Sequence, residues 1–454
     1  MPKVFTSIFP YTQEPVAEYP LMNDAAINQS VQAAEKAFTQ WRQYSFAQRA
    51  KVLNRTAEIL RNTKEALASL ITLEMGKTTT EALAEIEKCA LVCNYYATHA
   101  EAFLKDEIQQ TGFYKSLLHY QPIGAVLGIM PWNFPFWQVF RYAVPTLMAG
   151  NVTLLKHAPN VCGCAKKIET IFLEAGAPAG VFQTIIADVD VVPKLLEQNI
   201  VQALTLTGSE QAGSAAASIA GRHIKKTVLE LGGSDALIVL PDADLQKAAN
   251  TALQSRMQNA GQSCIAAKRF IVHQAAINEF MQHLLSTVKK YQQGNPFDTH
   301  INLGPMARTD LAKKLEQQLQ QSVQQGAQLV YGGEFIGCNV SPVVLLNVKP
   351  GMPAFDEETF GPLAAITVVQ TENEAIALAN QSRYGLGAAI WTKDIDRAMF
   401  LARQIQSGAV FINSTVRSMP ELPFGGTKKS GYGRELGRQG LLEFVHTQTI
   451  AADI

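Results

Sequence analysis

The sequence predicts an α/β protein whose first domain is a doubly wound parallel sheet and whose latter half is a second α/β domain. Short apolar runs such as AVLGIM and ALTLTG end in, or are followed by, Gly, Pro, Asn or Asp and then an amphipathic helical stretch. This is the pattern of a parallel sheet covered by helices. A second series of runs begins near Gly233. With 454 residues, the chain exceeds the size at which one hydrophobic core keeps growing, so more than one domain is expected.

Helices are predicted before the first series of strands. From Asn28 to Thr111, apolar residues recur three and four positions apart through VQAAEKAFTQW, RAKVLNRTAEILRNTKEALASLITLEM and EALAEIEKCALVCNYYATHAEAFL, with a break at Gly76-Lys77. This spacing predicts amphipathic helices that form a scaffold without evident chemistry. The segment SLLHYQP that follows predicts an exposed strand.

The strands of the two domains are predicted in chain order. The first series is AVLGIM, NVTLLK, VFQTII, ALTLTG, TVLELGG and ALIVL, and the second is RFIVH, AQLVYGG, SPVVLL, LAAITVV, GAAIWT and GAVFIN. The hinge between the domains is expected near Glu230 to Gly233. The C-terminal LLEFVHTQTI alternates apolar and polar residues in part, which predicts a strand added to another sheet, in this chain or in a partner.

Composition narrows the function classes. Lys plus Arg and Asp plus Glu both number 39, so nothing favours nucleic acid or an acidic membrane as partner, and a small-molecule ligand fits better. The first residues, MPKVFTSIFPYTQEP, lack the apolar core of a signal peptide, and a cytoplasmic protein is expected. The uncharged stretch from Ile123 to Phe140 contains prolines and polar residues, which predicts a buried strand and turn instead of a membrane span.

The cysteines indicate neither a metal site nor a disulfide framework. They stand at positions 89, 93, 162, 164, 264 and 338, without paired C-x-x-C spacing and without histidines at ligand spacing. No metal is therefore expected. Cys89 and Cys93, one helical turn apart, are interpreted as small buried hydrophobic residues.

Two residues could act as a nucleophile and a base. Cys264 lies in NAGQSCIAAKRF, where small and polar neighbours leave a thiol accessible to a substrate. Glu230 precedes Leu-Gly-Gly at the end of a predicted strand, which is where ligands bind in open α/β sheets. Taken alone, a structural Cys and a solvated Glu are the commoner interpretations.

Other segments predict an oxyanion donor and a cofactor site. Asn133 follows Trp132 in a proline-bounded turn that would fix the orientation of its amide, although Asn in such a turn more often bonds only local backbone. Lys156 ends the run NVTLLK, and Gly208-Ser209 ends another run at a predicted helix start. A helix N-terminus favours bound anions. A simple helix cap is the alternative interpretation of Gly208-Ser209.

These motifs, in their order along the chain, resemble the aldehyde dehydrogenase superfamily over nearly the whole length. The motifs are Asn133, Lys156, Gly208-Ser209, the ELGG at Glu230, Cys264, EETFGP at residues 357–362 and PFGGTKKSGYGRE at residues 423–435. Several independent motifs in one order make a chance match implausible. KHAPN and NAGQSCIAAKRF are most similar to the shorter bacterial succinate-semialdehyde dehydrogenases.

The resemblance implies a mechanism. The Cys264 thiolate would attack an aldehyde carbon, with the oxyanion held by the Asn133 amide and the Cys264 backbone N–H. Hydride would pass to NAD or NADP. Glu230 would then activate the water that hydrolyses the resulting thioester.

The resemblance also implies a set of cofactor-binding residues. They are Lys156 and Glu358 for the ribose hydroxyls, Gly208 and Ser209 for the pyrophosphate region, Trp132 nearby, and Phe360 beside the nicotinamide ribose. NAD-preferring members commonly carry an acidic residue three positions after the lysine, where this chain has Pro159. An acidic group there would repel a 2′-phosphate, so its absence leaves NADP open beside NAD.

Succinic semialdehyde is the substrate that the resemblance implies. Arg141, eight residues after the candidate oxyanion donor, matches the carboxylate-binding arginine of succinate-semialdehyde dehydrogenases, and a guanidinium pairs bidentately with a carboxylate. Gln258 stands where other members carry a further arginine. Arg256, or Arg417 with Ser418, is the candidate for the second contact, and a surface or packing arginine is the alternative for each.

Domain boundaries and assembly are implied in the same way. A Rossmann-like cofactor-binding domain would comprise residues 1–103 and 123–232, and a catalytic domain residues 233–430. A small β oligomerisation arm would comprise residues 104–122 and 431–454. A homodimer or homotetramer is expected, with no nucleic-acid or membrane partner.

Other functions fit the sequence less well. A coenzyme-A-acylating dehydrogenase needs no water-activating base, whereas Glu230 is present. A catalytically inactive structural or binding protein on the same fold would leave Asn133, Glu230 and Cys264 free to change, and all three are present. A thiol protease would need a Cys-His pair with an orienting Asn, and none is evident among the eight histidines. A dehydrogenase for another small aldehyde stays open.

Overall fold

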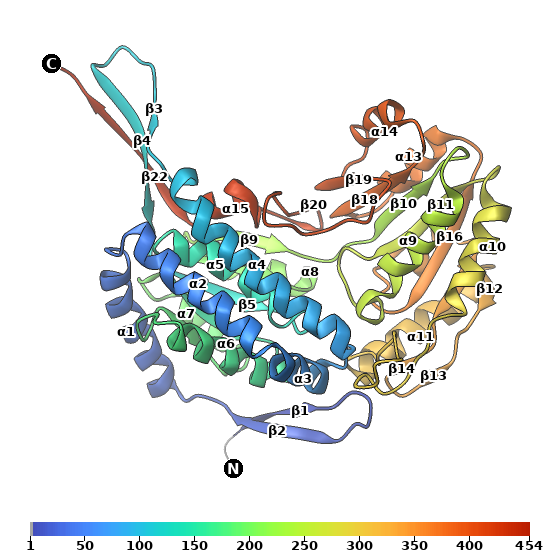
Figure 1. The fold of residues 1–454 in the computed structure, drawn as a ribbon, viewed down its shortest axis with the longest axis horizontal. Coiled ribbons are helices and arrows are strands. Elements are labelled where there is room, and N and C mark those ends of the chain that lie inside the picture. Colours follow the sequence, from blue (N-terminus) through green and yellow to red (C-terminus); the bar gives the residue numbers. More distant parts are fainter. Residues whose placement is uncertain (1–2) are drawn as a thin grey trace.

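Two α/β domains and a projecting β arm make up the chain (Figure 1). Over residues 3–454, which the computed structural model describes, the strands form two large sheets, of six and seven strands. The predicted α/β class and its two domains are confirmed. Within this range no helix is both long enough and apolar enough to cross a membrane.

The six-stranded sheet of the first domain is doubly wound. Its order is β21-β9-β8-β5-β6-β7, so the chain builds β6 and β7 on one side of β5 and then returns to build β8 and β9 on the other side. This reversal leaves a crevice at the carboxyl ends of β5 and β8, which is where ligands bind in such sheets. The strands are β5 (Ala125–Met130), β6 (Val152–His157), β7 (Phe182–Thr184), β8 (Val201–Thr207), β9 (Lys226–Glu230) and the antiparallel edge strand β21 (Gly431–Tyr432).

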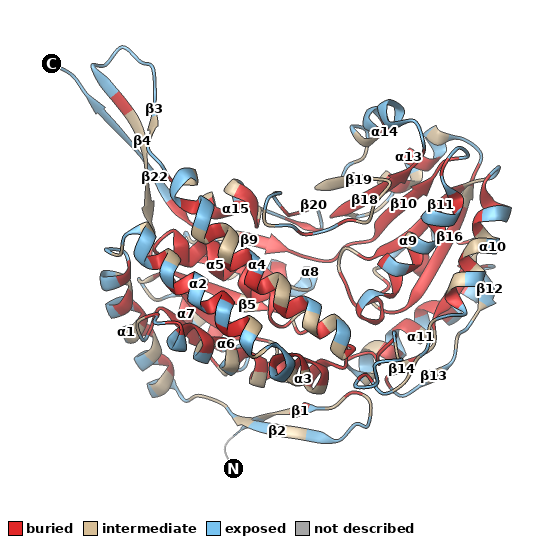
Figure 2. Cartoon of the chain, viewed as in Figure 1, coloured by how far each residue is buried: buried red, intermediate tan, exposed pale blue. Residues whose placement is uncertain are grey.

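Helices pack on this sheet with their apolar faces buried (Figure 2). The helix α3 ends at Gly76, whose φ of 86° lies in the left-handed region that glycine enters without strain, so the predicted break at Gly76-Lys77 is confirmed. The helices are α1 (Asp24–Trp41), α2 (Phe46–Asn62), α3 (Lys64–Met75), α4 (Thr79–Phe103), α5 (Trp137–Met148), the 3-10 turn η1 (Pro159–Val161), α6 (Cys162–Glu174), α7 (Val191–Leu196) and α8 (Glu210–Arg222). A hairpin of β1 (Val4–Ile8) and β2 (Pro15–Pro20) precedes them. Cys89 and Cys93 are fully buried in α4, as predicted.

The seven-stranded sheet of the second domain has the order β12-β15-β16-β11-β10-β18-β19. Its strands are β10 (Asp235–Val239), β11 (Ala267–His273), β12 (Gln328–Tyr331), β15 (Val343–Leu346), β16 (Leu363–Val369), β18 (Gly387–Trp391) and β19 (Ala409–Ile412). The run ALIVL forms β10. The sequence pattern groups this run with the strands of the first domain, whereas the structure places β10 in the sheet of the second domain. The smaller strands here are β13 (Phe335–Ile336), β14 (Asn339–Val340), β17 (Tyr384–Gly385) and β20 (Thr427–Lys428). The helices are α9 (Leu245–Met257), η2 (Gln258–Gly261), α10 (Ile277–Val288), α11 (Thr309–Gln324), α12 (Pro353–Asp356), α13 (Glu372–Asn380) and α14 (Ile395–Ala402).

The arm is a three-stranded sheet that extends away from the first domain (Figure 1). It contains β3 (Glu107–Ile108), β4 (Lys115–Pro122) and β22 (Val445–Ala452), and β22 pairs antiparallel with β4 along its whole length. The C-terminal strand therefore joins a sheet of its own chain.

The C-terminal boundary of the arm differs from the prediction of 431–454. The strand β21 pairs with β9, and the helix α15 (Gly437–Leu442) packs against α4 and α5, with Leu441 only 1% exposed. Burial of these apolar side chains places residues 431–442 on the first domain, which leaves β22 as the arm's C-terminal strand.

Candidate active site

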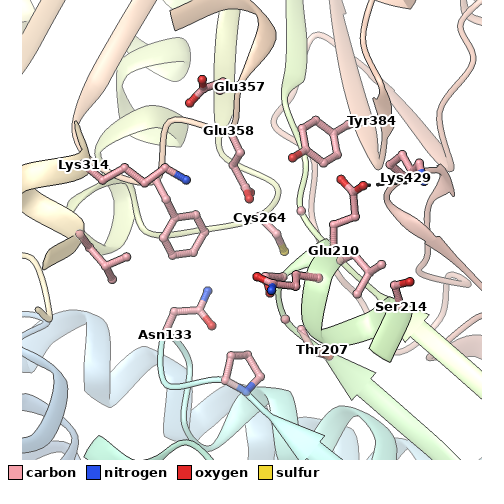
Figure 3. A pocket seen from close by; sticks show the side chains of 18 of the residues that line it. Asn133, Thr207, Glu210, Ser214, Cys264, Lys314, Glu357, Glu358, Tyr384 and Lys429 are labelled. Carbon is pink, nitrogen blue, oxygen red and sulfur yellow. Dashed lines mark ion pairs between the residues drawn. The ribbon is translucent and has the colours of Figure 1, made fainter. Parts of the chain in front are cut away.

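The crevice at the ends of β5 and β8 opens into a cleft of about 1320 Å³ that residues of both domains line. Pockets for drug-sized ligands measure roughly 300–1,000 Å³, so this cleft has room for a dinucleotide together with a small substrate. Its wall includes Trp132, Asn133, Gly208, Ser209, Cys264, Glu358 and Phe360, all of which the sequence nominated. In Figure 3, Cys264 lies between Asn133 on one side and Glu358 on the other.

Cys264 follows a loop with an unusual backbone. Residues 259–261 have φ values of 54°, 51° and 72°, in a region that residues other than glycine enter at a cost. The buried Arg256 holds this loop, because its Nη2 donates to the carbonyl oxygens of Gly261 at 2.5 Å and of Gly361 at 2.7 Å. Arg256 therefore supports the loop, and its guanidinium is engaged by backbone.

The protonation of Cys264 depends on its surroundings. Burial raises the pKa of the thiol to about 11, and the positive charges of Arg141 and Lys268 act in the opposite direction. The thiol is therefore protonated at neutral pH in this state. To act as a nucleophile, this thiol would first have to lose its proton.

Lys268 is a neighbour of the nucleophile that the sequence analysis did not single out. It lies at the start of β11, is fully buried, and its Nζ donates to the carbonyl oxygens of Ser263 at 2.9 Å and of Cys264 at 2.7 Å. The same ammonium lies 3.6 Å from Oε1 of Glu358. The available signal was a lysine four residues after a candidate nucleophile, at the start of a strand whose centre, Phe270 to Val272, is apolar.

Asn133 stands directly beside the nucleophile loop. Its Nδ2 donates to the carbonyl oxygen of Gln262 at 3.0 Å, and its carbonyl oxygen accepts from Nδ2 of Asn259 at 2.7 Å. The proline-bounded turn that carries it is held by the ring of His157, which contacts the carbonyl oxygens of Met130 at 3.2 Å and Pro135 at 2.9 Å. The side-chain amide is thus fixed next to the backbone of the nucleophile loop.

Glu230 ends β9 and is 2% exposed. Within residues 3–454, neither of its carboxylate oxygens has a hydrogen-bond partner. Burial raises its pKa well above the ordinary value, the charge of Arg141 lowers it, and the nearby Glu435 raises it. A Cβ on Gly425 would lie 2.9 Å from its Oε1, so the carboxyl group rests against the PFGG segment and does not line the cleft.

Arg141 lies on α5, is 1% exposed, and already has a protein partner. Its Nε donates to the carboxylate of Glu435, with which it forms an ion pair, and its Nη2 donates to Oγ1 of Thr207 at 3.3 Å. Glu435 belongs to the PFGG…GYGRE motif, and the sequence analysis gave this residue no role. The Arg141 charge is therefore close to Cys264 and Glu230 but is balanced within the protein.

The three remaining substrate candidates occupy different environments. Gln258 and Arg417 are exposed, and Nε of Arg417 donates to Oγ1 of Thr415 at 3.2 Å. Ser418 is 4% exposed, and its hydroxyl lies in a buried cluster described below. Of the three, Ser418 alone is buried.

The residues nominated for a cofactor are arranged along the first domain and the facing loop. Ser209 caps α8 by accepting from the backbone N–H of Ala212, so the helix N-terminus faces the cleft. The rings of Trp132 and Phe360 meet edge to face with their centres 5.8 Å apart. Lys156 ends β6 next to β5, and burial lowers its pKa. It does not line the cleft described above.

This set has the donor chemistry that a dinucleotide needs. The N-terminus of α8 suits a pyrophosphate, and the Glu358 carboxylate suits a ribose hydroxyl. Oε1 of Glu358 accepts from the backbone N–H of Gly233 at 3.0 Å, so the segment that joins β9 to β10 fixes this carboxylate.

Comparison with known proteins identifies the family to which the chain belongs. The sequence model of the aldehyde dehydrogenase family matches residues 2–450. The chain belongs to this family. It is therefore an aldehyde dehydrogenase, an oxidoreductase that converts an aldehyde to a carboxylic acid.

Similar aldehyde dehydrogenases cover the whole chain. A probable succinate-semialdehyde dehydrogenase (NADP+) of Synechocystis is 47% identical over 98% of this chain and 98% of its own. Succinate semialdehyde dehydrogenase (NAD(P)+) of Escherichia coli K12 is 44% identical over 98% of this chain and 97% of its own. The crystal structure of succinic semialdehyde dehydrogenase from Streptococcus pyogenes in complex with NADP+ is 37% identical, covers 99% of this chain and 100% of its own, and has a TM-score of 0.97.

Proposed function

We propose that this aldehyde dehydrogenase oxidises succinic semialdehyde to succinate with NAD or NADP as the hydride acceptor. The observation that carries the proposal is the similarity, over 98% of both chains at 47% identity, to a relative named for this substrate and for NADP. The structure adds support, because burial raises the pKa of Cys264 and the buried guanidinium of Arg141 is close enough for its charge to oppose that rise. Arg141 is paired with Glu435, but its charge still acts on Cys264, and a cation near the candidate nucleophile favours an aldehyde that carries a carboxylate.

The first step falls to Cys264 and Asn133. Once its proton is removed, Sγ of Cys264 adds to the aldehyde carbon, and the carbonyl oxygen takes up the negative charge. Nδ2 of Asn133 exchanges the Gln262 carbonyl oxygen, 3.0 Å away, for this oxyanion, and the backbone N–H of Cys264 is the second donor. A bound nicotinamide cofactor supplies the acceptor for the hydride that the thiohemiacetal then loses.

Hydrolysis of the thioester falls to Glu230. Water adds to the thioester carbon while the carboxylate of Glu230 takes one of its protons, and the thiolate of Cys264 leaves with succinate released. Because the Glu230 oxygens have no partner within residues 3–454, no hydrogen bond has to break when the side chain turns from Gly425 toward the thioester. The raised pKa of Glu230 makes the ionised carboxylate a stronger base.

The arm supports a homo-oligomer. Most of β22 is exposed, with seven of its eight residues in that class, and a strand edge of this kind is suited to pairing with another copy of the chain. A homodimer or homotetramer built through β4 and β22 follows from the family resemblance.

The substrate assignment is tested by steady-state kinetics of the purified enzyme, in which reduction of NAD or of NADP is followed. The rates with succinic semialdehyde are compared with those with butanal, which has the same number of carbons and no carboxylate. Because hydrogen bonds to charged groups are worth about 1.5–3 kcal/mol, kcat/KM for succinic semialdehyde should exceed that for butanal by at least about tenfold. Cys264→Ala is the negative control. Equal kcat/KM values would overturn the substrate assignment, and formation of a coenzyme-A thioester when that thiol is added would favour the acylating alternative.

A further inference from the structure

A partly buried lysine from α4, Lys88, lies beside the candidate Ser418. Nζ of Lys88 donates to Oγ of Ser418 at 2.8 Å and lies 3.9 Å from the ring centre of Trp137. Nε1 of Trp137 donates to the same Oγ at 3.0 Å. Three segments far apart in the sequence, α4, α5 and the loop before PFGG, thus meet at one hydroxyl.

The charge of Lys88 is not balanced by a protein carboxylate. Within residues 3–454, no ion pair includes Lys88. The carboxylate one helical turn earlier, Glu85, pairs with Lys77 at 2.5 Å and accepts from the backbone N–H groups that open α5, and Glu435 is held by Arg141. Lys88 is partly withdrawn from water, and an ammonium that loses hydration without gaining a counter-ion is destabilised, so an anionic ligand would be favourable beside it.

Lys88 is also close to the nucleophile. Burial and then the charge of Arg141 lower its pKa to about 8, while Cys264 is among the groups that raise it. The large cleft that holds the candidate cofactor-binding residues is not lined by this cluster, which comprises Lys88, Trp137, Arg141 and Ser418. This cluster is therefore separate from the wall of the cofactor cleft.

The hydroxyl of Ser418 is available as a hydrogen-bond donor. A serine hydroxyl has one donor and two acceptor positions, and Lys88 and Trp137 fill both acceptor positions. Among residues 3–454 no acceptor receives the Ser418 proton. A carboxylate placed there would accept from the ammonium and from the hydroxyl at once, which is the strong, charge-assisted arrangement.

We propose that Lys88, together with Ser418, binds the carboxylate of the substrate and sets the preference for an aldehyde with a terminal carboxylate. This inference rests on the proposed function, since the ligand is the carboxylate of succinic semialdehyde. Gln258, which stands where other members carry a further arginine, is uncharged and exposed, so Lys88 is the proposed source of the second positive charge. Arg141 already pairs with Glu435 and donates to Thr207, so its hydrogen bonds are not free for the substrate.

The test measures the ratio of kcat/KM for succinic semialdehyde to kcat/KM for butanal. The ratio is compared between Lys88→Met and a matched control, Lys105→Met. Lys105 is an exposed lysine just beyond the end of α4. Lys88→Met should lower the ratio about 10–100-fold, mainly through KM for succinic semialdehyde, and Lys105→Met should leave it unchanged. An unchanged ratio in Lys88→Met overturns the inference while a high wild-type ratio keeps the proposed function. A wild-type ratio near one overturns the proposed function itself.

The pH dependence supplies a readout that a purely structural role would not move. The groups acting on Lys88 are Arg141, Cys89, Glu85 and Cys264, and the ammonium loses its proton as pH rises through about 8. The wild-type ratio should therefore fall above about pH 8, whereas ionisation of Cys264 affects both aldehydes and cancels. A flat ratio would count against Lys88. If Lys88→Met does not fold, Ser418→Ala tests the same cluster, because loss of the hydroxyl should also lower the ratio and an unchanged ratio would refute it.

Discussion

The buried ion pair between Arg141 and Glu435 allows a prediction with a definite size. The two side chains are 2% and 1% exposed, so solvent does not screen them, and the small value of a surface pair, about 0–1 kcal/mol, does not apply. Replacing Arg141 with Met leaves the Glu435 carboxyl buried without its cation. Breaking a buried pair costs about 3–5 kcal/mol, which is a large part of the roughly 5–15 kcal/mol that holds a protein folded.

Urea unfolding followed by intrinsic fluorescence measures this loss. Arg141→Met should lower the free energy of unfolding by about 3–5 kcal/mol, and the double variant Arg141→Met with Glu435→Met should recover most of it because both charges are gone. The matched control is Arg397→Met, which breaks the exposed pair with Glu372 and should cost under about 1 kcal/mol.

Two outcomes would refute this reasoning. One is a loss in Arg141→Met no larger than that in Arg397→Met. The other is a double variant whose loss equals the sum of the two single losses, because the side chains would then act independently. A third result is a double variant that regains stability without regaining the preference for succinic semialdehyde. That result would mean that Arg141 interacts with the substrate in addition to pairing with Glu435.

Three further predictions concern the chemistry. Glu230→Gln should lower kcat about 10²–10⁴-fold. Stopped flow should still show a burst of cofactor reduction equal to the enzyme concentration, and loss of the burst would mean that Glu230 acts before the thioester has formed. Because burial raises the pKa of Cys264 to about 11, alkylation of Cys264 by iodoacetamide, followed by mass spectrometry, should accelerate about tenfold per pH unit between about pH 7 and pH 10, and a plateau near pH 7 would contradict this. Pro159→Glu should reduce kcat/KM for NADP relative to NAD at least about tenfold, since a like charge would face the 2′-phosphate; an unchanged ratio would place the phosphate elsewhere.

Local pattern was enough to predict the sheets. Runs such as AVLGIM and LAAITVV became β5 and β16, because strands buried on both faces need continuous apolar sequence and helices need a different spacing. The crevice between β5 and β8 then follows from strand order. Asn133 and Gly208-Ser209 reach one cleft because each directly follows a parallel strand of the same sheet.

Partners across long sequence distances could not be predicted in this way. Glu435 lies 294 positions from Arg141, and Ser418 lies 330 positions from Lys88. Nothing in the local pattern of either segment selects the other, since each contact depends on how segments distant in the sequence pack against α4 and α5. The packing of residues 431–442 on the first domain has the same origin, because the pairing of Gly431 with Glu230 is set by tertiary structure.

The return of the C-terminal segment to the first domain has a consequence for how the protein is made. The second sheet is encoded without interruption between β10 and β19, residues 235–412, whereas the first sheet lacks its edge strand until Tyr432 has been synthesised. In the arm, Gln121 meets its partner Gln448 only after 327 further positions. On the ribosome, the middle of this chain can therefore complete its sheet before the beginning does. Until residues 445–452 have been synthesised, one edge of β4 stays unpaired, because β22 is the strand that covers it.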